Sequence, residues 1–399
     1  MSAVREVRLG DVVKVIGGGT PSRANPAYYG GDIPWVTPKD MKSWSIVGAQ
    51  VNITREGLDN SSARMAPENS ILVVVRSGVL KHTVPIGLNR VPVAINQDMK
   101  AVICGEGVHP DYLARALKAR SGEILSWVRA TTADNFPIDK LKELKVVLPP
   151  LAEQRRIADV LDRVDTLRAK RRAALDLLGA ARTAAFVHMF GDPILNDRSW
   201  KRMALGALVE RIHSGRSPIC LDRPASEGEW AVLKLGAVTS GEFRPAENKA
   251  LPVTVAPRAE DEVRAGDILF SRKNTRDLVA ACVLVRSTPV RRLMPDLMFR
   301  LELKEEAPVV AEYLHALLSY PPKRRTVQDL ASGSAGSMPN ISKGNLATVA
   351  VEVPPLDLQR EFASAISSIE TAKVVQRRAL GELDALFASL QHRAFRGEL

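Results

Sequence analysis

The amino-acid sequence predicts an α+β protein with two duplicated mixed α/β domains, separated by two long helices that form an antiparallel coiled coil. Three observations support this fold class. The chain has 399 residues, which is enough for two or three domains of ordinary size. A series of short motifs occurs twice in the same order. Each copy ends in a segment whose apolar residues follow the spacing of a coiled coil.

The repeated motifs indicate a domain duplication. Residues 148–151 (Leu-Pro-Pro-Leu) return as residues 353–356 (Val-Pro-Pro-Leu), displaced by 205 positions. Near the start of the chain, residues 9–10 (Leu-Gly) return as residues 205–206, displaced by 196 positions. The period is far longer than the roughly 20–50 residues of a solenoid repeat, so each copy is expected to be a whole domain with its helix.

Residues 1–148 and 191–352 are the two predicted mixed domains. Short apolar runs such as residues 71–75 alternate with Gly, Pro, Asn and Asp, which is typical of strands joined by turns. The segments around Tyr112 and Tyr313 favour helices. Both domains are therefore expected to combine strands with short helices.

Residues 149–190 and 353–399 contain the two predicted long helices. Their apolar residues recur at intervals of four and three, as at the a and d positions of a coiled coil. A helix of about 38 residues would be roughly 57 Å long, which exceeds the width of a domain of this size. Each helix is therefore expected to project and to pair with its own copy. The predicted seam residues are Ile157, Leu161, Val164, Leu175, Leu178, Phe362, Ile366, Ile369, Leu380, Leu383, Phe387 and Leu390.

Both apolar stripes become polar near their middle. Arg168 and Arg171 occupy seam positions in the first helix, and Lys373 and Gln376 occupy the equivalent positions in the second. Polar seam residues specify register at some cost in stability. An alternative arrangement, in which each amphipathic helix packs only on its own domain, remains open from the sequence.

The charge balance favours a polyanionic partner. The chain has 56 Lys and Arg against 45 Asp and Glu, a formal net charge of +11. Two related domains joined by long helices would suit duplex DNA, because a two-fold-related pair reads half-sites on opposite strands. Since the two copies differ at most positions, the two half-sites are expected to differ and the target to be asymmetric.

The cysteines and the apolar runs indicate a cytoplasmic protein with no membrane partner. Cys104, Cys220 and Cys282 are far apart and form no Cys-x-x-Cys motif, which is typical of reduced thiols. The first residues lack the hydrophobic core of a signal peptide. The apolar run at residues 71–75 is too short to cross a bilayer.

The motifs that flank the long helices resemble the specificity subunit of type I restriction-modification systems. These motifs are Leu-Pro-Pro-Leu-x-x-Gln-Arg-Arg-Ile at residues 148–157, Phe-Gly-Asp-Pro at residues 190–193 and Val-Pro-Pro-Leu-x-x-Gln-Arg at residues 353–360. The resemblance covers the whole chain in the family's order of recognition domain, helix, recognition domain, helix. One departure is that residues 395–398 read Phe-Arg-Gly-Glu instead of Phe-Gly-Asp-Pro.

The resemblance implies a non-catalytic subunit that reads a bipartite, asymmetric target in double-stranded DNA and acts in phage defence. The first domain would read the 5′ part of the target and the second the 3′ part, with a spacer set by the helices. Its partners would be two modification (adenine methyltransferase) subunits and two restriction-translocation subunits. No cofactor is expected on this chain, because the partners would use S-adenosylmethionine, ATP and Mg²⁺.

Candidate DNA contacts lie in two polar loops of each domain. Residues 18–23 and 215–218 combine glycine, hydroxyl and arginine groups that suit a phosphate. Residues 76–78 and 271–276 follow strands and carry Arg, Lys or Asn, which pair with guanine and adenine edges. Simple turns and solvated basic loops are the alternatives. The predicted contacts are Thr20, Ser22, Arg23, Arg76, Ser77, Lys81, Arg216, Ser217, Arg272, Lys273, Asn274 and Arg276.

Two other functions remain open from the sequence. Asp296, Glu302 and Lys304 superficially match a metal-dependent nuclease centre, in which carboxylates bind Mg²⁺ and the metal activates water. A protein–protein adaptor that binds no DNA is the other possibility. The Asn-Pro-Pro-Tyr/Phe motif of an adenine methyltransferase is missing, and the six histidines form no pair at metal-ligand spacing, so no metal site is expected.

Overall fold

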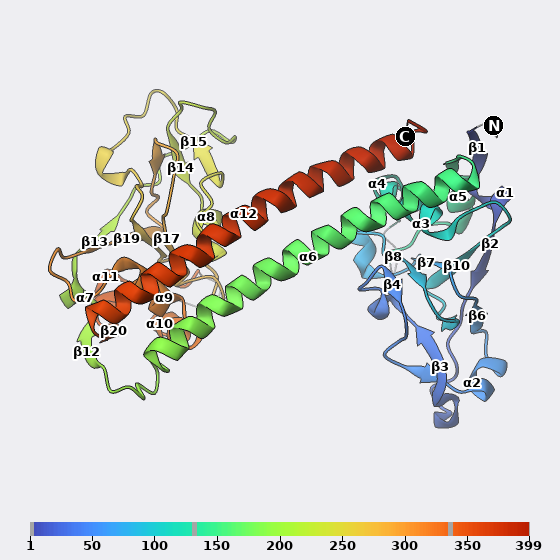
Figure 1. The fold of residues 1–399 in the computed structure, drawn as a ribbon, viewed down its shortest axis with the longest axis horizontal. Coiled ribbons are helices and arrows are strands. Elements are labelled where there is room, and N and C mark those ends of the chain that lie inside the picture. The colour runs from blue at the N-terminus through green and yellow to red at the C-terminus, as the bar shows by residue number, and fades with distance from the viewer. Residues whose placement is uncertain (1–3, 130–133, 334–337, 399) are drawn as a thin grey trace. The chain divides into compact units, whose positions relative to one another are not determined.

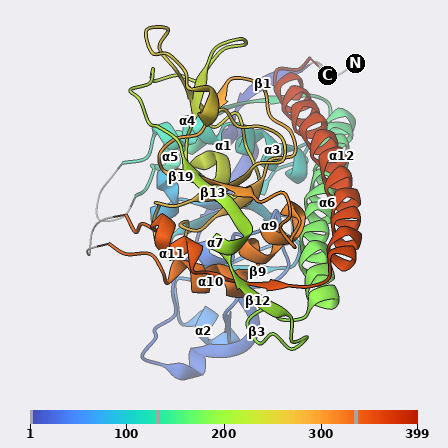
Figure 2. The same cartoon turned by 90° about the vertical axis from the view of Figure 1, so that its left-hand side faces the viewer.

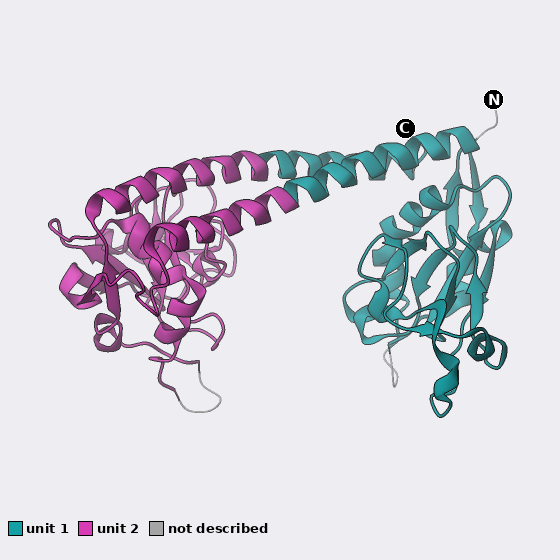
Figure 3. Ribbon diagram, turned by 60° about the horizontal axis from the view of Figure 1, so that its bottom comes forward, with its two compact units in different colours: residues 1–172, 378–399 teal, residues 173–377 magenta. Residues whose placement is uncertain are grey.

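The computed structural model describes residues 4–129, 134–333 and 338–398 and divides into two compact units. Unit 1 comprises Met1–Arg172 and Arg378–Leu399, and unit 2 comprises Ala173–Arg377 (Figure 3). The division falls within the long helices rather than at their ends. Each unit therefore contains one α+β domain and parts of both helices.

The α+β domain of unit 1 is built on three sheets (Figure 1). A five-stranded sheet has the order β2-β10-β7-β8-β4, a four-stranded sheet has the order β5-β3-β9-β6, and β1 pairs with β11. Strand β4 is parallel to β8 and β3 is parallel to β9. The strands are β1 (Arg5–Arg8), β2 (Val13–Gly17), β3 (Tyr29–Val36), β4 (Ser45–Ile46), β5 (Asn52–Ile53), β6 (Arg64–Ala66), β7 (Ile71–Val74), β8 (Ile86–Asn89), β9 (Val93–Ile95), β10 (Met99–Cys104) and β11 (Lys145–Leu148). The short helices are α1 (Leu9–Val12), α2 (Arg55–Asp59), α3 (Pro110–Ala119), α4 (Ser121–Ser126) and α5 (Ile138–Glu143).

The apolar run of residues 71–75 contains strand β7, which is buried in the core of unit 1. Ile71 and Val73 belong to one buried cluster, whereas Leu72 and Val74 belong to another. Successive side chains of a strand point to opposite faces of the sheet, so both faces of β7 are covered. A strand buried on both sides needs apolar residues at every position, as the sequence has here.

The α+β domain of unit 2 repeats this topology. Its main sheet has the order β13-β19-β16-β17, which corresponds to β2-β10-β7-β8 of unit 1. Its β14 and β18 are parallel, as β3 and β9 are, and β12 pairs with β20 as β1 pairs with β11. The predicted duplication is therefore confirmed. The strands are β12 (Lys201–Ala204), β13 (Val209–Ser214), β14 (Ala231–Leu233), β15 (Asn248–Ala250), β16 (Ile268–Ser271), β17 (Cys282–Leu284), β18 (Arg292–Leu293), β19 (Met298–Leu303) and β20 (Ala350–Val353), and the short helices are α7 (Leu205–Leu208), α8 (Gly236–Thr239), α9 (Ala311–Ser319), α10 (Pro321–Gln328) and α11 (Lys343–Ala347).

The two long helices are α6 (Leu151–Phe190, 40 residues) and α12 (Leu356–Ala394, 39 residues). In unit 1, Ile157 near the start of α6 shares a buried cluster with Ala394 at the end of α12. In unit 2, Phe186 near the end of α6 shares a buried cluster with Phe362 near the start of α12. Figure 2 shows the molecule with unit 2 facing the viewer. The helices thus run antiparallel, and the predicted fold class is confirmed.

Each domain packs against both long helices. The alternative in which each helix packs only on its own domain is therefore wrong. The reason is that the apolar stripe of each helix continues past its own domain, and each end enters a separate buried cluster. The predicted seam residues that are more than nine-tenths buried are Ile157, Leu161, Val164, Phe362 and Ile366. The half-buried ones are Leu175, Leu178, Ile369, Leu380, Leu383, Phe387 and Leu390.

A buried glutamine fixes the start of each long helix. The side-chain oxygen of Gln154 accepts a hydrogen bond from the backbone N–H of His109 at 2.9 Å. Its amide group donates to the carbonyl oxygens of Gly107 at 3.0 Å and Pro149 at 2.8 Å. Gln359 makes the three equivalent bonds in unit 2. The Gln in the Pro-Pro-Leu-x-x-Gln motif therefore connects the helix to the loop that precedes α3 or α9.

One described helix, α6, is long enough and apolar enough in one stretch to cross a membrane by length and composition alone. This stretch reflects the Ala- and Leu-rich second half of the helix. The property is weak evidence for a membrane, since Phe186 and Phe190 in this half pack into the buried cluster of unit 2.

Candidate nucleic-acid interface

The predicted glycine loops meet a strand end in the same way in both units. A Cβ atom at Gly18 would collide with the carbonyl oxygen of Ile95, where β9 ends. A Cβ atom at Gly215 would collide with the carbonyl oxygen of Met294, just after β18. Only glycine permits this approach of two backbones. The loops after β2 and β13 are thereby held against the turns that lead into β10 and β19.

In unit 1 this crossing forms the polar pocket, a cavity of about 610 Å³. It brings together four predicted contacts, namely Thr20 and Arg23 from the glycine loop and Arg76 and Ser77 from the segment after β7. Two turns that are distant in sequence therefore face one space. Its volume falls within the range of pockets that hold small molecules or single bases.

Hydrogen bonds between side chains order the polar pocket. The hydroxyl group of Thr20 donates to the side-chain oxygen of Gln97. The guanidinium Nε of Arg76 donates to Asp98 Oδ1 at 2.5 Å, and Asn96 Nδ2 donates to Asp98 Oδ2 at 3.2 Å. The side chain of Arg76 is still 48% exposed, so part of its guanidinium group faces solvent and is available to a ligand.

Several residues of the polar pocket were not predicted from the sequence. Trp35 at the end of β3 donates its indole N–H to the carbonyl oxygen of Gly19 at 3.0 Å, which joins the pocket wall to the glycine loop. Asp40 accepts hydrogen bonds from the backbone and hydroxyl of Thr37, both at 2.8 Å. Lys39, which lies between Thr37 and Asp40 in the sequence, also lines the cavity. The only sequence signal is the Thr-Pro-Lys-Asp turn after a strand, which by itself is a common cap.

Unit 2 has a pocket at the equivalent crossing, with a volume of about 390 Å³. Of the predicted contacts, Ser217 lines it, and its hydroxyl donates to the carboxylate of Asp296, as Thr20 does to Gln97 in unit 1. Lys234 and Lys249 also line this pocket and were not predicted. The remaining wall is largely apolar, so the two pockets differ in chemistry although the backbones correspond.

Both lysines of the unit 2 pocket have acidic partners. Lys249 Nζ lies 2.8 Å from Asp222 Oδ1, and this hydrogen bond lowers the pKa of the Asp222 carboxyl. Lys234 Nζ lies 3.3 Å from Glu247 Oε2. All four side chains are substantially exposed, so solvent and salt weaken these pairs and a phosphate could compete for the lysines.

The segment after β16 does not enter the unit 2 pocket. Arg272 Nε donates to Asn340 Oδ1 at 3.1 Å, and its guanidinium group lies 4.9 Å from the ring centre of Phe299. Lys273 and Arg276 are exposed to solvent.

Asn274 is buried, and its contact with a base stays a prediction. Its side chain is only 4% exposed, because the segment folds back against the loop around Pro339. Its Oδ1 accepts a hydrogen bond from the backbone N–H of Thr275. Ser22, Lys81 and Arg216 are exposed but lie outside both pockets.

The candidate nuclease residues have other partners. Glu302 on β19 accepts hydrogen bonds from Arg211 at 2.9 and 3.0 Å and from Arg300 at 3.1 Å. The bond from Arg211 lowers the pKa of Glu302. The carboxylate of Asp296 is bonded to Ser217. Within residues 4–129, 134–333 and 338–398, no group of three or more His, Cys, Asp or Glu side chains could hold a metal ion.

Two α+β domains of one topology, each with its own pocket and each packed on two shared helices, define a duplicated scaffold with two unlike pockets. Residues 1–176 match the model of the Type I restriction modification DNA specificity domain. Residues 1–176 thus carry a domain of the type I restriction-modification specificity subunits, and the resemblance noted in the sequence is confirmed.

Curated relatives carry the same family name. The chain is 40% identical over 162 residues to the specificity subunit of the type I restriction enzyme EcoR124I/EcoR124II from Escherichia coli, which covers 40% of this chain and 40% of that protein. It is 33% identical over 168 residues to the EcoEI specificity subunit from Escherichia coli, which covers 42% of this chain and 28% of that protein. The chain thus spans less than half the length of these two relatives.

Solved structures share the fold over nearly the full chain. The S subunit of a type I restriction-modification system from M. genitalium matches with a TM-score of 0.63 and 14% identity, covering 98% of this chain and 96% of that one. A chain from a structure of type I complex assembly and conformational transition matches with a TM-score of 0.51 and 19% identity, covering 99% and 98%. At these identities the similarity shows the common fold.

Proposed function

We propose that this chain is the sequence-specific DNA-binding subunit of a type I restriction-modification complex, with no catalytic activity of its own. The observation that carries the proposal is the pair of equivalent but chemically different pockets in a duplicated fold. Each domain reads one half of a split target in double-stranded DNA. Because the pocket linings differ, the two halves of the target differ as well.

The chemistry of each pocket suits the edge of a base pair. In unit 1, Arg76 offers guanidinium donors, and the exposed Gln97 offers an amide group that pairs with adenine. In unit 2, Lys234 and Lys249 offer ammonium groups beside an apolar wall, which suits a guanine edge or a phosphate next to a thymine methyl group. The net charge of +11 supplies the general attraction to DNA.

The exposed apolar residues of the long helices are the proposed docking surface for two methyltransferase subunits and, with them, two restriction-translocation subunits. In unit 2, Leu177 on α6 is 70% exposed, and Val374 and Val375 on α12 are 62% and 60% exposed. In unit 1, Leu167 and Leu386 are each 46% exposed. Large apolar side chains at the surface of a helix are typical of a partner interface.

The cofactors of the complex belong, in this proposal, to the partners. S-adenosylmethionine serves the methyltransferase subunits, and ATP and Mg²⁺ serve the restriction-translocation subunits. The complex works in the cytoplasm, which suits a chain whose three cysteines are free. Burial raises the pKa of Cys104 and Cys282 to about 12, so both thiols stay protonated and unreactive.

The test is to assemble the chain with its methyltransferase partners and map methylated adenines in genomic DNA. We expect one split sequence. Arg76→Ala should relax the half read by unit 1 and Lys249→Ala the half read by unit 2, each by roughly 1–3 kcal/mol at one base pair. Arg264→Ala is the matched control, because Arg264 is exposed and its side chain has no partner among the described residues.

Two results would overturn this proposal. One is methylation at unrelated or undivided sites, and the other is an identical target profile for the wild type and both pocket variants. A second experiment addresses the spacer: deletion of about one helical turn from both α6 and α12 should keep the half-sites and shorten the gap between them. An unchanged gap would show that the helices do not set the spacer.

A further inference from the structure

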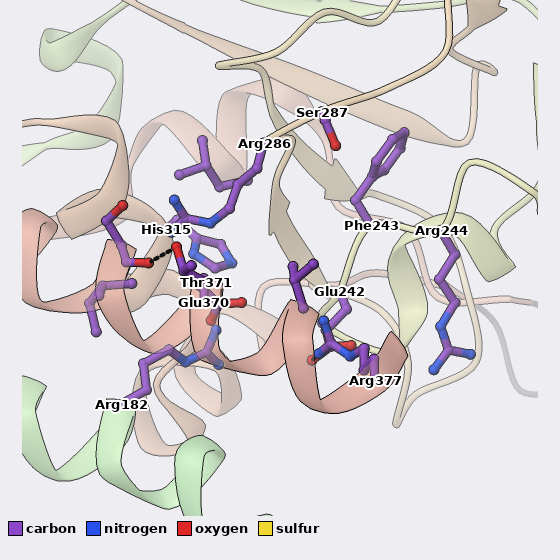
Figure 4. Close-up of a pocket in the computed structure, with 15 residues that line it drawn as sticks. Arg182, Glu242, Phe243, Arg244, Arg286, Ser287, His315, Glu370, Thr371 and Arg377 are labelled. Atoms are coloured by element: carbon purple, nitrogen blue, oxygen red, sulfur yellow. Dashed lines mark hydrogen bonds and ion pairs between the residues drawn. The ribbon is translucent and has the colours of Figure 1, made fainter. Parts of the chain in front are cut away.

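Unit 2 contains a second cavity, of about 490 Å³, that plays no part in the proposed reading of DNA. It lies where α6, α9 and α12 meet the loops after α8 and β17, and Figure 4 shows its lining. Arginines from four of these elements line it, namely Arg182 on α6, Arg244 after α8, Arg286 after β17 and Arg377 on α12. Of its lining residues, only Val374 also belongs to the proposed docking surface for the partner subunits.

The cavity carries a surplus of unpaired positive charge. Its two carboxylates are already matched, since Glu242 accepts from Arg377, and Glu370 lies 3.1 Å from Lys373. Within the described part of the chain, Arg182 and Arg286 make no hydrogen bond or ion pair through their side chains. Two guanidinium groups that face one cavity without a carboxylate partner form a site for an anion.

A buried histidine gives an independent indication of a ligand. His315 on α9 is 8% exposed and lines the cavity between Arg286 and Thr371 (Figure 4). Its Nε2 atom is buried and has no hydrogen-bond partner among the described residues. Burial, together with Arg182 and Arg286, lowers the pKa of His315 to about 3, so the imidazole is neutral at pH 7. A buried polar atom without a partner is costly, and a bound ligand would remove that cost.

The corresponding junction of unit 1 shows how the protein otherwise satisfies such charge. There Arg115 on α3 is 4% exposed in its side chain and pairs with Asp165 at 2.8 Å and Asp162 at 3.1 Å, both on α6. The repeat places Ser367 of α12 at the position of Asp162. It places Ala316 at the position of Arg115, so unit 2 keeps neither this arginine nor one of its carboxylates, and the arginines of its cavity come from other positions.

We propose that the unit 2 cavity binds a phosphate oxyanion, either free phosphate or the phosphate group of a small metabolite such as a nucleoside monophosphate. Arg182 and Arg286 donate charged hydrogen bonds to its oxygens. The ring N–H of the neutral His315 donates to the backbone carbonyl of Cys282, so its Nε2 is an acceptor and takes the hydrogen bond of the phosphate P–OH group. The volume exceeds that of phosphate alone, and the ring of Phe243 on the cavity wall provides a surface on which a base can stack.

The experiment uses the full chain and two probes, inorganic phosphate and adenosine monophosphate, each compared with chloride at equal ionic strength. Isothermal titration measures affinity, and the NMR signal of the His315 imidazole locates the binding. We expect saturable binding with one site per chain and a shift of that signal. Arg182→Gln and Arg286→Gln should each weaken binding about tenfold or more, since each removes a charged hydrogen bond.

Arg264→Gln is the control and should bind as the wild type does, because Arg264 is exposed in the same unit and outside the cavity. Circular-dichroism melting in chloride establishes that the variants are folded. Tighter binding of the monophosphate would assign a nucleotide, and equal binding would assign the oxyanion alone. Binding no stronger than that of chloride, equal affinity in both cavity variants and wild type, or an unmoved His315 signal would each overturn the proposal.

Discussion

Units 1 and 2 have the same topology but hold their long helices in different ways. In unit 2 the helices meet the domain through an aromatic cluster, where Phe190 lies 4.7 Å from Tyr313 and 5.1 Å from Phe362 between ring centres. In unit 1 the position of Phe362 is taken by Ile157, and an ionic network around Arg168 and Asp384 joins the two helices further along. The backbone was retained after duplication while the side-chain contacts diverged.

The contacts that both units share involve the backbone. Tyr112 and Tyr313 each donate a hydrogen bond at 2.7 Å to a backbone carbonyl of the strand before the long helix. Gln154 and Gln359 each bond to one backbone N–H and two backbone carbonyls. Such bonds do not depend on neighbouring side chains, so they persist while the core around them changes. These hydrogen bonds to the backbone therefore specify the fold, whereas the side chains around them fill the core.

The largest expected effect is at the aromatic cluster. Phe362→Ala should lower the free energy of unfolding of unit 2 by about 4 kcal/mol, because Phe362 is fully buried and its removal leaves a cavity. Ile157→Ala, its counterpart in unit 1, should cost about 2–3 kcal/mol. Urea unfolding followed by hydrogen exchange in each unit measures both values. Equal losses would mean that the aromatic cluster adds nothing beyond ordinary burial.

The buried ion pair of unit 2 gives a second test. Glu352 is 1% exposed and lies 2.8 Å from Lys323 and 3.0 Å from Arg202, whereas the equivalent residue of unit 1 is Val147. Glu352→Val should cost about 3 kcal/mol, because it leaves Lys323 buried without a partner. The double variant with Lys323→Met should recover most of that loss. If the double variant is no more stable than Glu352→Val alone, the loss comes from the ion pair itself and not from a buried Lys323 without a partner.

The pH dependence of stability should differ between the units because of His315. The pKa of His315 is about 3 in the folded protein against an ordinary value of 6.5, so the unfolded chain binds more protons between these values. Stability is therefore present above pH 6.5 and lost as the pH falls towards 3, by about 2 kcal/mol at pH 5. His315→Leu should flatten this slope in urea titrations at pH 7 and pH 5. Ala114 occupies this position in unit 1, so the slope attributed to His315 should have no counterpart there.

The smallest effect is expected at the exposed ionic network of unit 1. Asp384 is 42% exposed in its side chain and pairs with Arg168 at 2.6 Å and Arg172 at 3.2 Å. Solvent screens these pairs, so Asp384→Ala should cost less than about 1 kcal/mol, and the loss should shrink further in high salt. Thermal melting at low and high salt measures it. A loss as large as that of Phe362→Ala would contradict the view that the ionic network of unit 1 contributes less stability than the aromatic cluster of unit 2.

The fold could be predicted from the sequence much more fully than the candidate interface. The seam from Ile157 to Leu390 is periodic, and period is a local property of the chain. The polar pocket instead combines Trp35, Arg76 and Gln97, which are tens of residues apart and meet only through the sheet order. Asn274 illustrates the limit, since its sequence context suits base contact but its side chain is buried where the segment meets the distant loop around Pro339.

The sharing of the long helices also has a consequence for the order in which the chain can be completed during synthesis. Unit 2 is one continuous stretch, Ala173–Arg377, whereas unit 1 needs Arg378–Leu399 to cover the cluster around Ile157 and Leu161. Domains tend to fold as they leave the ribosome. Unit 1 is therefore the first to begin folding but the last to have all of its residues synthesised. Until α12 arrives, the nascent first lobe keeps an apolar face open, and it is at this stage that chaperones would be needed most.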